Sequence, residues 1–203
     1  DCTIKPITGH GSQHNVSIRP IQHISSDRVK VFTLINTGAR FVSFFADQLN
    51  SRFLPENVET LVNRLADEIA DEIPLHRERW VDEDADQWNW RENVDQMIQW
   101  GYERPAYMWQ HLTDFFDLSD PVEVTISGID TAAGTVTVNN NISISSETWS
   151  GRYFPEFTVT VKATANQGFL FAHWSGGSDA SDATILINAS EALELTPVFV
   201  AAP

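Results

Sequence analysis

The sequence predicts an α+β protein with a helical bundle-like N-terminal half and a small antiparallel all-β C-terminal domain. Between Thr37 and Phe116 apolar residues recur every three or four positions, which is the spacing of one face of a helix. From Pro121 onward apolar and polar residues alternate, which is the spacing of half-buried strands. We therefore expect three parts: an irregular or extended N-terminal segment at 1–36, a helical region at 37–118 and a small β domain at 121–203.

Composition limits the classes of partner. The chain has 203 residues with 28 acids against 13 bases, a formal charge of −15. Such a charge disfavours phosphate backbones and anionic membrane surfaces, so we expect no nucleic-acid partner. No apolar run approaches the roughly 18 residues that span a bilayer, so we expect no membrane insertion.

Composition predicts one regular element in the N-terminal segment. Arg28 to Ile35 reads RVKVFTLI, and its β-branched residues predict a strand. A strand needs a sheet edge to satisfy its amides and carbonyls, and the predicted β domain offers one. We expect the strand to dock there within the chain. The alternative is strand addition to a neighbouring copy, which would make the protein self-associate.

Two helices and the start of a third are predicted between Thr37 and Trp80. The first has an apolar face formed by Phe41, Phe44, Phe45 and Leu49. The second begins at Pro55, which favours the first helical turn, and the third continues from Pro74 to Trp80. The apolar face of the second helix comprises Val58, Leu61, Val62, Leu65, Ile69 and Ile73.

An acidic run follows the third helix. Asp82, Asp84 and Asp86 have the alternate spacing that begins a calcium loop, because three such carboxylates can converge on one hard cation. The remainder of that loop does not match, since Gln87 stands where the turn needs glycine and Asn93 where a bidentate glutamate is expected. We therefore expect a solvated acidic link and no cofactor, with calcium binding as the alternative.

The remaining helical pattern predicts two further helices. The first runs from Trp88 or Asn89 to Trp100 and ends at Gly101. The second opens at Pro105 and continues to Phe116 with a buried apolar face.

The β domain is predicted from short alternating segments that turn residues separate. There is no room for helical crossovers between them, so neighbouring strands must be joined by turns. The segments are VEVTIS, GTVTVNN, FTVTVKATA, GFLFAHW, ATILIN and LELTPVFV.

Aromatic residues give a second functional interpretation. Seven tryptophans either fill a core or present a surface on which sugar rings stack. Turns flank Trp149, Tyr153 and Trp174, which makes them the candidates for a stacking platform.

Two blocks of the sequence resemble known families. The helical half resembles the C-terminal end of the CotH family of secreted kinase-like proteins through three segments: ARFVSFFADQLNSRFLPENVETLVNRLADEI, the H-x-x-R-W at His76 to Trp80, and RPAYMWQHLTDFF. The β half, with GTVTVNN and WSGRYFPEFTVTVKATANQGFLFAHWSG, is similar to the bacterial repeat domain related to InlB B-repeats. Together the two resemblances cover about residues 37 to 200.

The resemblance implies a secreted protein at the cell surface or outside the cell. The catalytic acids and nucleotide-binding lysine of the CotH family precede its helical region, and residues 1–36 contain no segment that matches them. The expectation is therefore the tail of a larger protein, a processed product or a family member without its kinase core. The repeat-domain resemblance places Trp174 in the core, which leaves Trp149 and Tyr153 as binding candidates.

Two functions follow from these observations. The first is a non-catalytic scaffold or interaction region without enzymatic activity, whose partner is a protein. The alternative is a carbohydrate-binding module that recognises a cell-surface polysaccharide through Trp149 and Tyr153. Exposure of the aromatic rings distinguishes the two, because a sugar platform must face solvent.

Overall fold

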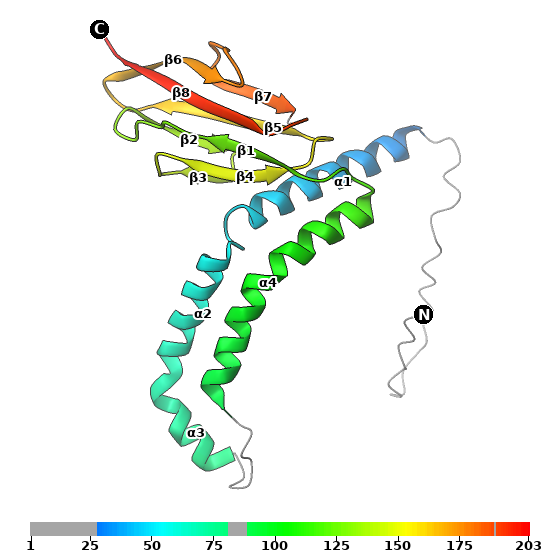
Figure 1. The fold of residues 1–203 in the computed structure, drawn as a ribbon, viewed down its shortest axis with the longest axis vertical. Helices are drawn as coiled ribbons and strands as arrows, with labels where there is room; N and C mark the ends of the chain where they lie inside the picture. Colours follow the sequence, from blue (N-terminus) through cyan, green and yellow to red (C-terminus); the bar gives the residue numbers. More distant parts are fainter. Residues whose placement is uncertain (1–27, 81–88, 189) are drawn as a thin grey trace. The chain divides into compact units, whose positions relative to one another are not determined.

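The computed structural model describes residues 28–80, 89–188 and 190–203, with side chains described from Thr37 onward. The chain divides into two compact units, Asp1–Asn36 and Thr37–Pro203. The second unit is α+β as predicted, with helices up to Phe116 and two β-sheets after it (Figure 1).

Four α-helices occupy the described part of the N-terminal half. Two of the predicted starting points are confirmed. Pro55 is the first residue of its helix, and Asn89 caps another, with its side-chain oxygen accepting a hydrogen bond from the Glu92 amide at 3.2 Å. The helices are α1 (Arg28–Leu49), α2 (Pro55–Ile69), α3 (Ile73–Trp80) and α4 (Trp90–Phe116), with a 3-10 turn at Ala70–Glu72 between α2 and α3.

The predicted strand from Arg28 to Ile35 is wrong, because these residues form the first turns of α1. The β-branched composition favoured a strand, but β propensity depends strongly on context. Extending a helix that already exists adds one hydrogen bond per residue without a new nucleation cost. The expected docking of this segment on a sheet, within or between chains, therefore loses its basis.

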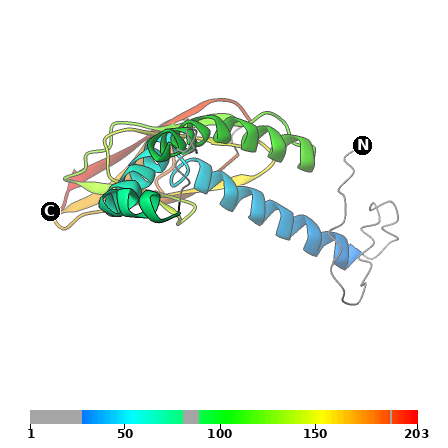
Figure 2. The ribbon, with the colours of Figure 1, turned by 90° about the horizontal axis from the view of Figure 1, so that it is seen from below.

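The predicted break at Gly101 and Pro105 is also wrong, because both residues lie inside the 27-residue helix α4. Gly101 is buried where α4 crosses α2, and a Cβ there would lie 2.6 Å from Val58 Cγ1. The glycine therefore permits close approach of two helices and does not end one. Pro105 lacks an amide donor and its ring crowds the carbonyl four residues earlier, yet α4 continues through it. Figures 1 and 2 show α2 running beside α4.

The β half contains eight strands in two four-stranded sheets. All six predicted segments form strands, whereas β3 and β4 were not predicted, because β3 has only three residues and β4 contains a glycine at its centre. The sheet orders are β4-β1-β8-β6 and β3-β2-β5-β7. The strands are β1 (Val122–Ile126), β2 (Gly134–Val138), β3 (Ile142–Ile144), β4 (Trp149–Tyr153), β5 (Thr158–Ala165), β6 (Phe169–Gly176), β7 (Thr184–Asn188) and β8 (Leu193–Ala201).

Strand pairing is antiparallel with one exception. Strands β1 and β8 pair in parallel, with Val124 opposite Leu193. They are the first and last strands of the block, so their pairing brings its two ends together without a crossover helix. The other pairs, β1–β4, β6–β8, β2–β3, β2–β5 and β5–β7, are antiparallel as predicted.

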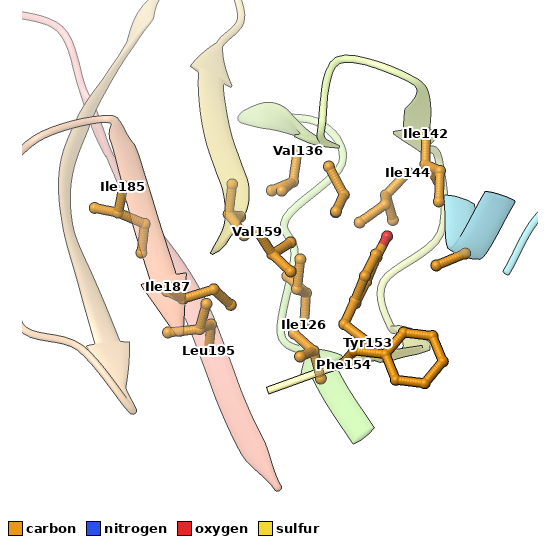
Figure 3. Close-up of a cluster of buried hydrophobic side chains, with 14 of the residues drawn as sticks. Ile126, Val136, Ile142, Ile144, Tyr153, Phe154, Val159, Ile185, Ile187 and Leu195 are labelled. Atoms are coloured by element: carbon orange, nitrogen blue, oxygen red, sulfur yellow. The ribbon is translucent and has the colours of Figure 1, made fainter. Parts of the chain in front are cut away.

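The core lies between the two sheets and continues into the helices. Alternate residues of β1, β2 and β5 point inward, and Figure 3 shows Ile126, Val136 and Val159 among them. The same cluster of buried side chains includes Val42 of α1 and Leu112 of α4. The helical region and the β block therefore share one apolar core.

Candidate functional site

Large apolar side chains remain exposed on the helical region. The predicted inward face of α1 is shifted, because Val42, Ala46 and Leu49 are buried while Phe41 and Phe44 are about half exposed. The predicted core positions of α2 behave similarly, since Ala66 is its one buried residue among those described. Leu61, Leu65 and Ile69, which were expected inside, are each about half exposed.

Exposed apolar side chains lie on α1, α2, α4 and the link between α1 and α2, and part of them line two hollows between these helices. Leu61, Leu65 and Ile69 continue the helical row that starts at Val58, which packs against Gly101 of α4. We call this surface the apolar helical face. It comprises Phe41 and Phe45 of α1, Phe53 and Leu54 of the link, Val58, Leu61, Leu65 and Ile69 of α2, and Met97, Trp100, Met108 and Phe115 of α4.

A pocket and a groove lie within the apolar helical face. The pocket has a volume of about 180 Å³ and lies where Phe53 and Val58 meet Trp100 and Arg104. The groove has a volume of about 600 Å³ and runs between α1 and the last turns of α4. Phe45 and Met108 line both, so the two hollows are adjacent. Nearly all of the lining is apolar, which suits apolar side chains of another molecule.

Two charged residues lie along this surface. Arg104 lines the pocket with its guanidinium 5.6 Å from the centre of the Trp100 ring, a cation–π contact that holds it beside the apolar wall. Asp114 lines the groove and accepts a hydrogen bond from Gln110 at 2.8 Å. The surface therefore carries a positive group at one end and a negative group at the other.

Polar contacts on another side of the helices fix α2 against α4. The Tyr102 hydroxyl donates to Glu59 at 2.6 Å, and the Arg91 guanidinium donates to Asn63 at 3.1 Å. The hydrogen bond to Glu59 raises the pKa of Tyr102 above its ordinary value. These contacts join α2 to α4 at two positions along their length.

The end of α1 joins the β block through a buried carboxylate. Asp47 is fully buried and accepts three hydrogen bonds: from Asn139 at 2.9 Å, from Asn141 at 2.7 Å and from the Tyr153 hydroxyl at 2.8 Å. Burial raises the pKa of the Asp47 carboxyl, while the three hydrogen bonds act in the opposite direction. Burial and the adjacent Asp47 also raise the pKa of Tyr153, which stays a protonated donor.

Asn50 completes this joint at the edge of a sheet. Strand β4 is an edge strand. The Asn50 side chain donates to the Arg152 carbonyl at 2.8 Å and accepts from the Arg152 amide at 2.9 Å, as a neighbouring strand would. Trp109 of α4 packs on the same strand, 5.6 Å from the Phe154 ring and beneath the Arg152 guanidinium. The helical region thus covers the β4 edge.

The predicted binding residues do not form an exposed aromatic pair. Tyr153 is 2% exposed, with its hydroxyl held by Asp47, so the expectation that it faces solvent is wrong. The Trp149 ring lies over Gly151, in the space that a Cβ would fill, and is half-buried. Ligand binding by Trp149 stays a prediction. Trp174 is fully buried, as expected.

The metal prediction falls outside the described part of the chain. Asp82, Asp84 and Asp86 belong to residues 81–88, which the structure does not describe. Among the residues that are described, no three His, Cys, Asp or Glu side chains are grouped to hold a metal ion. In the same part of the chain, no helix combines the length and apolar content that crossing a membrane requires.

The comparisons confirm the two resemblances in the predicted order. Residues 36–108 match the CotH kinase protein family. Residues 126–201 match the divergent InlB B-repeat domain. The two families together indicate a bacterial surface or coat protein. Neither the curated proteins nor the solved structures that were compared give a match.

Proposed function

We propose that this chain is a non-catalytic interaction region of an extracellular bacterial surface or coat protein, and that its apolar helical face docks another protein. The observation that supports the proposal is the exposure of large apolar side chains at helical spacing on α1, α2 and α4. Periodic apolar positions of α2 and α4 lie about half exposed, whereas Val94, Trp109 and Leu112 of α4 are buried. Apolar patches of this kind mark interaction sites on soluble proteins.

The chemistry of the face favours a protein over a polysaccharide. Its lining is almost entirely apolar, with Arg104 and Asp114 as the charged residues among those that line the two hollows. Sugar sites need amides or acids around an exposed ring to bind hydroxyl groups. Protein interfaces combine an apolar centre with a few charges at the margin, which is the arrangement here.

The proposal also holds that the chain transfers no phosphoryl group by itself. The part that matches the CotH family is helical, and the sequence offers no counterpart of that family's catalytic acids or nucleotide-binding lysine. Stabilisation of the chain by ATP and magnesium that saturates with nucleotide concentration would contradict this half of the proposal.

Photo-crosslinking from the apolar helical face tests whether this face docks another protein. Replacing Leu65 or Trp100 by p-benzoylphenylalanine in the producing cell should yield covalent adducts on illumination, because both side chains would lie within an interface. The matched control is Leu186, a well exposed residue of β7 in the β block. Adducts from Leu65 and Trp100 but not from Leu186 are expected. If illumination gives no adduct from the helical positions, the docking proposal fails.

A further inference from the structure

The outer side of α4 carries complementary features at its two ends. Near its middle, Trp100 and Arg104 line the apolar pocket of about 180 Å³. Near its C-terminal end Phe115 projects into solvent with 81% of its surface exposed. A pocket and a projecting ring on one helix face are the two halves of a contact that a second copy of the same surface can complete.

The spacing of these features fits two antiparallel helices. Phe115 follows Arg104 by eleven residues, which is roughly 16 Å along a helix at about 1.5 Å per residue. If two copies of α4 pack in opposite directions through their Met108 and His111 side, with the twofold axis level with Trp109, Phe115 of each copy lies at the other copy's pocket. One rotation makes both contacts, as an isologous interface requires.

Two charged residues of α4 fit the same twofold symmetry. In the arrangement centred near Trp109, Arg104 of one copy stands opposite Asp114 of the other, and the pair occurs twice. Arg104 lines the pocket and Asp114 lines the groove, so both lie on the surface that would be covered. Met108 and His111 occupy the centre of the seam. Opposite charges in this register favour the antiparallel pairing and disfavour the parallel one.

The exposed area is sufficient for a specific interface. A fully covered aromatic side chain buries roughly 150–250 Å². The exposed parts of Phe41, Phe53, Trp100 and Phe115, each about half of the side chain or more, therefore leave on the order of 500 Å². Two copies together then bury roughly 1,000 Å², which is the lower limit for a biological interface.

We propose that the occupant of the apolar helical face is a second copy of this chain, bound through antiparallel α4 helices with Phe115 of each copy in the pocket of the other. The inference rests on the proposed function, because it names the partner of the same surface. The net charge of −15 opposes self-association at a distance, so added salt should strengthen the dimer.

The oligomeric state of the full chain tests this proposal. Sedimentation equilibrium should give twice the chain mass of 22.8 kDa at micromolar concentration. Phe115→Asp should give a monomer without loss of folding, because the side chain is exposed in the single chain. Phe44→Asp is the matched control, since Phe44 is half exposed and lines neither hollow, and it should remain dimeric. A wild-type chain that stays monomeric, or a dimer that F115D leaves intact, overturns the inference.

Charge reversal distinguishes this dimer from any other. Arg104→Glu or Asp114→Arg alone places like charges opposite each other twice, and should weaken the dimer by about 100-fold. The double variant R104E/D114R restores opposite charges and should recover most of the wild-type affinity. Failure of the double variant to recover contradicts the antiparallel register. If the chain is monomeric but still crosslinks from Trp100 to a different protein, the proposed dimer is wrong. The proposed docking function is then still supported.

Discussion

Replacing Asp47 by alanine should destabilise the protein by roughly 2–4 kcal/mol, because the change removes the acceptor of three hydrogen bonds at a buried position. The Tyr153 hydroxyl is the most buried of the three donors and would lose the acceptor of its hydrogen bond. Denaturant unfolding followed by tryptophan fluorescence measures the loss. Asp67→Ala, which removes an exposed carboxylate from α2, should change stability by no more than about 0.5 kcal/mol.

A double-mutant cycle shows whether the effect acts through the joint. Tyr153→Phe removes the donor and keeps the ring in the core, so D47A and Y153F should be strongly coupled. Additive effects, or a D47A variant as stable as D67A, would contradict the role of Asp47 as the link between α1 and the β block.

Replacing Trp174 by alanine should cost about 3–5 kcal/mol, the range for removing a large aromatic side chain from a packed core. Trp174 has no exposed surface, and its indole nitrogen donates to the Asp182 carbonyl at 3.1 Å. Its ring lies 5.4 Å from that of Phe171. Trp80→Ala at the end of α3 is the control, since Trp80 is 70% exposed, and it should be nearly neutral. Equal losses for W174A and W80A would place Trp174 outside the stabilising core.

Much of the architecture could be predicted from periodicity. The start of α2 at Pro55, the start of α4 next to Asn89 and six of the eight strands follow from local pattern and turn residues. The errors arose where tertiary contacts override local preference. The local sequence indicates a helix end at Gly101. The residue lies inside α4 instead, because α2 packs directly against it.

The candidate site was harder to predict, because periodicity shows that a face is apolar and not what covers it. Leu61 and Leu65 were assigned to the core on their spacing, and the structure leaves them half exposed. Tyr153 was assigned to the surface because turns flank it, although Asp47, more than a hundred residues earlier, holds its hydroxyl. One signal could have indicated the joint: the run of three asparagines at 139–141 is typical of a turn whose amides are free to bind a distant acceptor.

The most direct test of whether protein covers the apolar helical face is hydroxyl-radical labelling of the chain in two states. One is the isolated chain at a concentration below its association range, and the other is the chain in its native assembly. Labelling of Trp100 and Phe115 should fall severalfold in the assembly, because an interface excludes solvent from its centre. Labelling of Leu186 on β7 should not change. Equal labelling of Trp100 and Phe115 in both states would show that the face stays open to solvent, and would contradict the account.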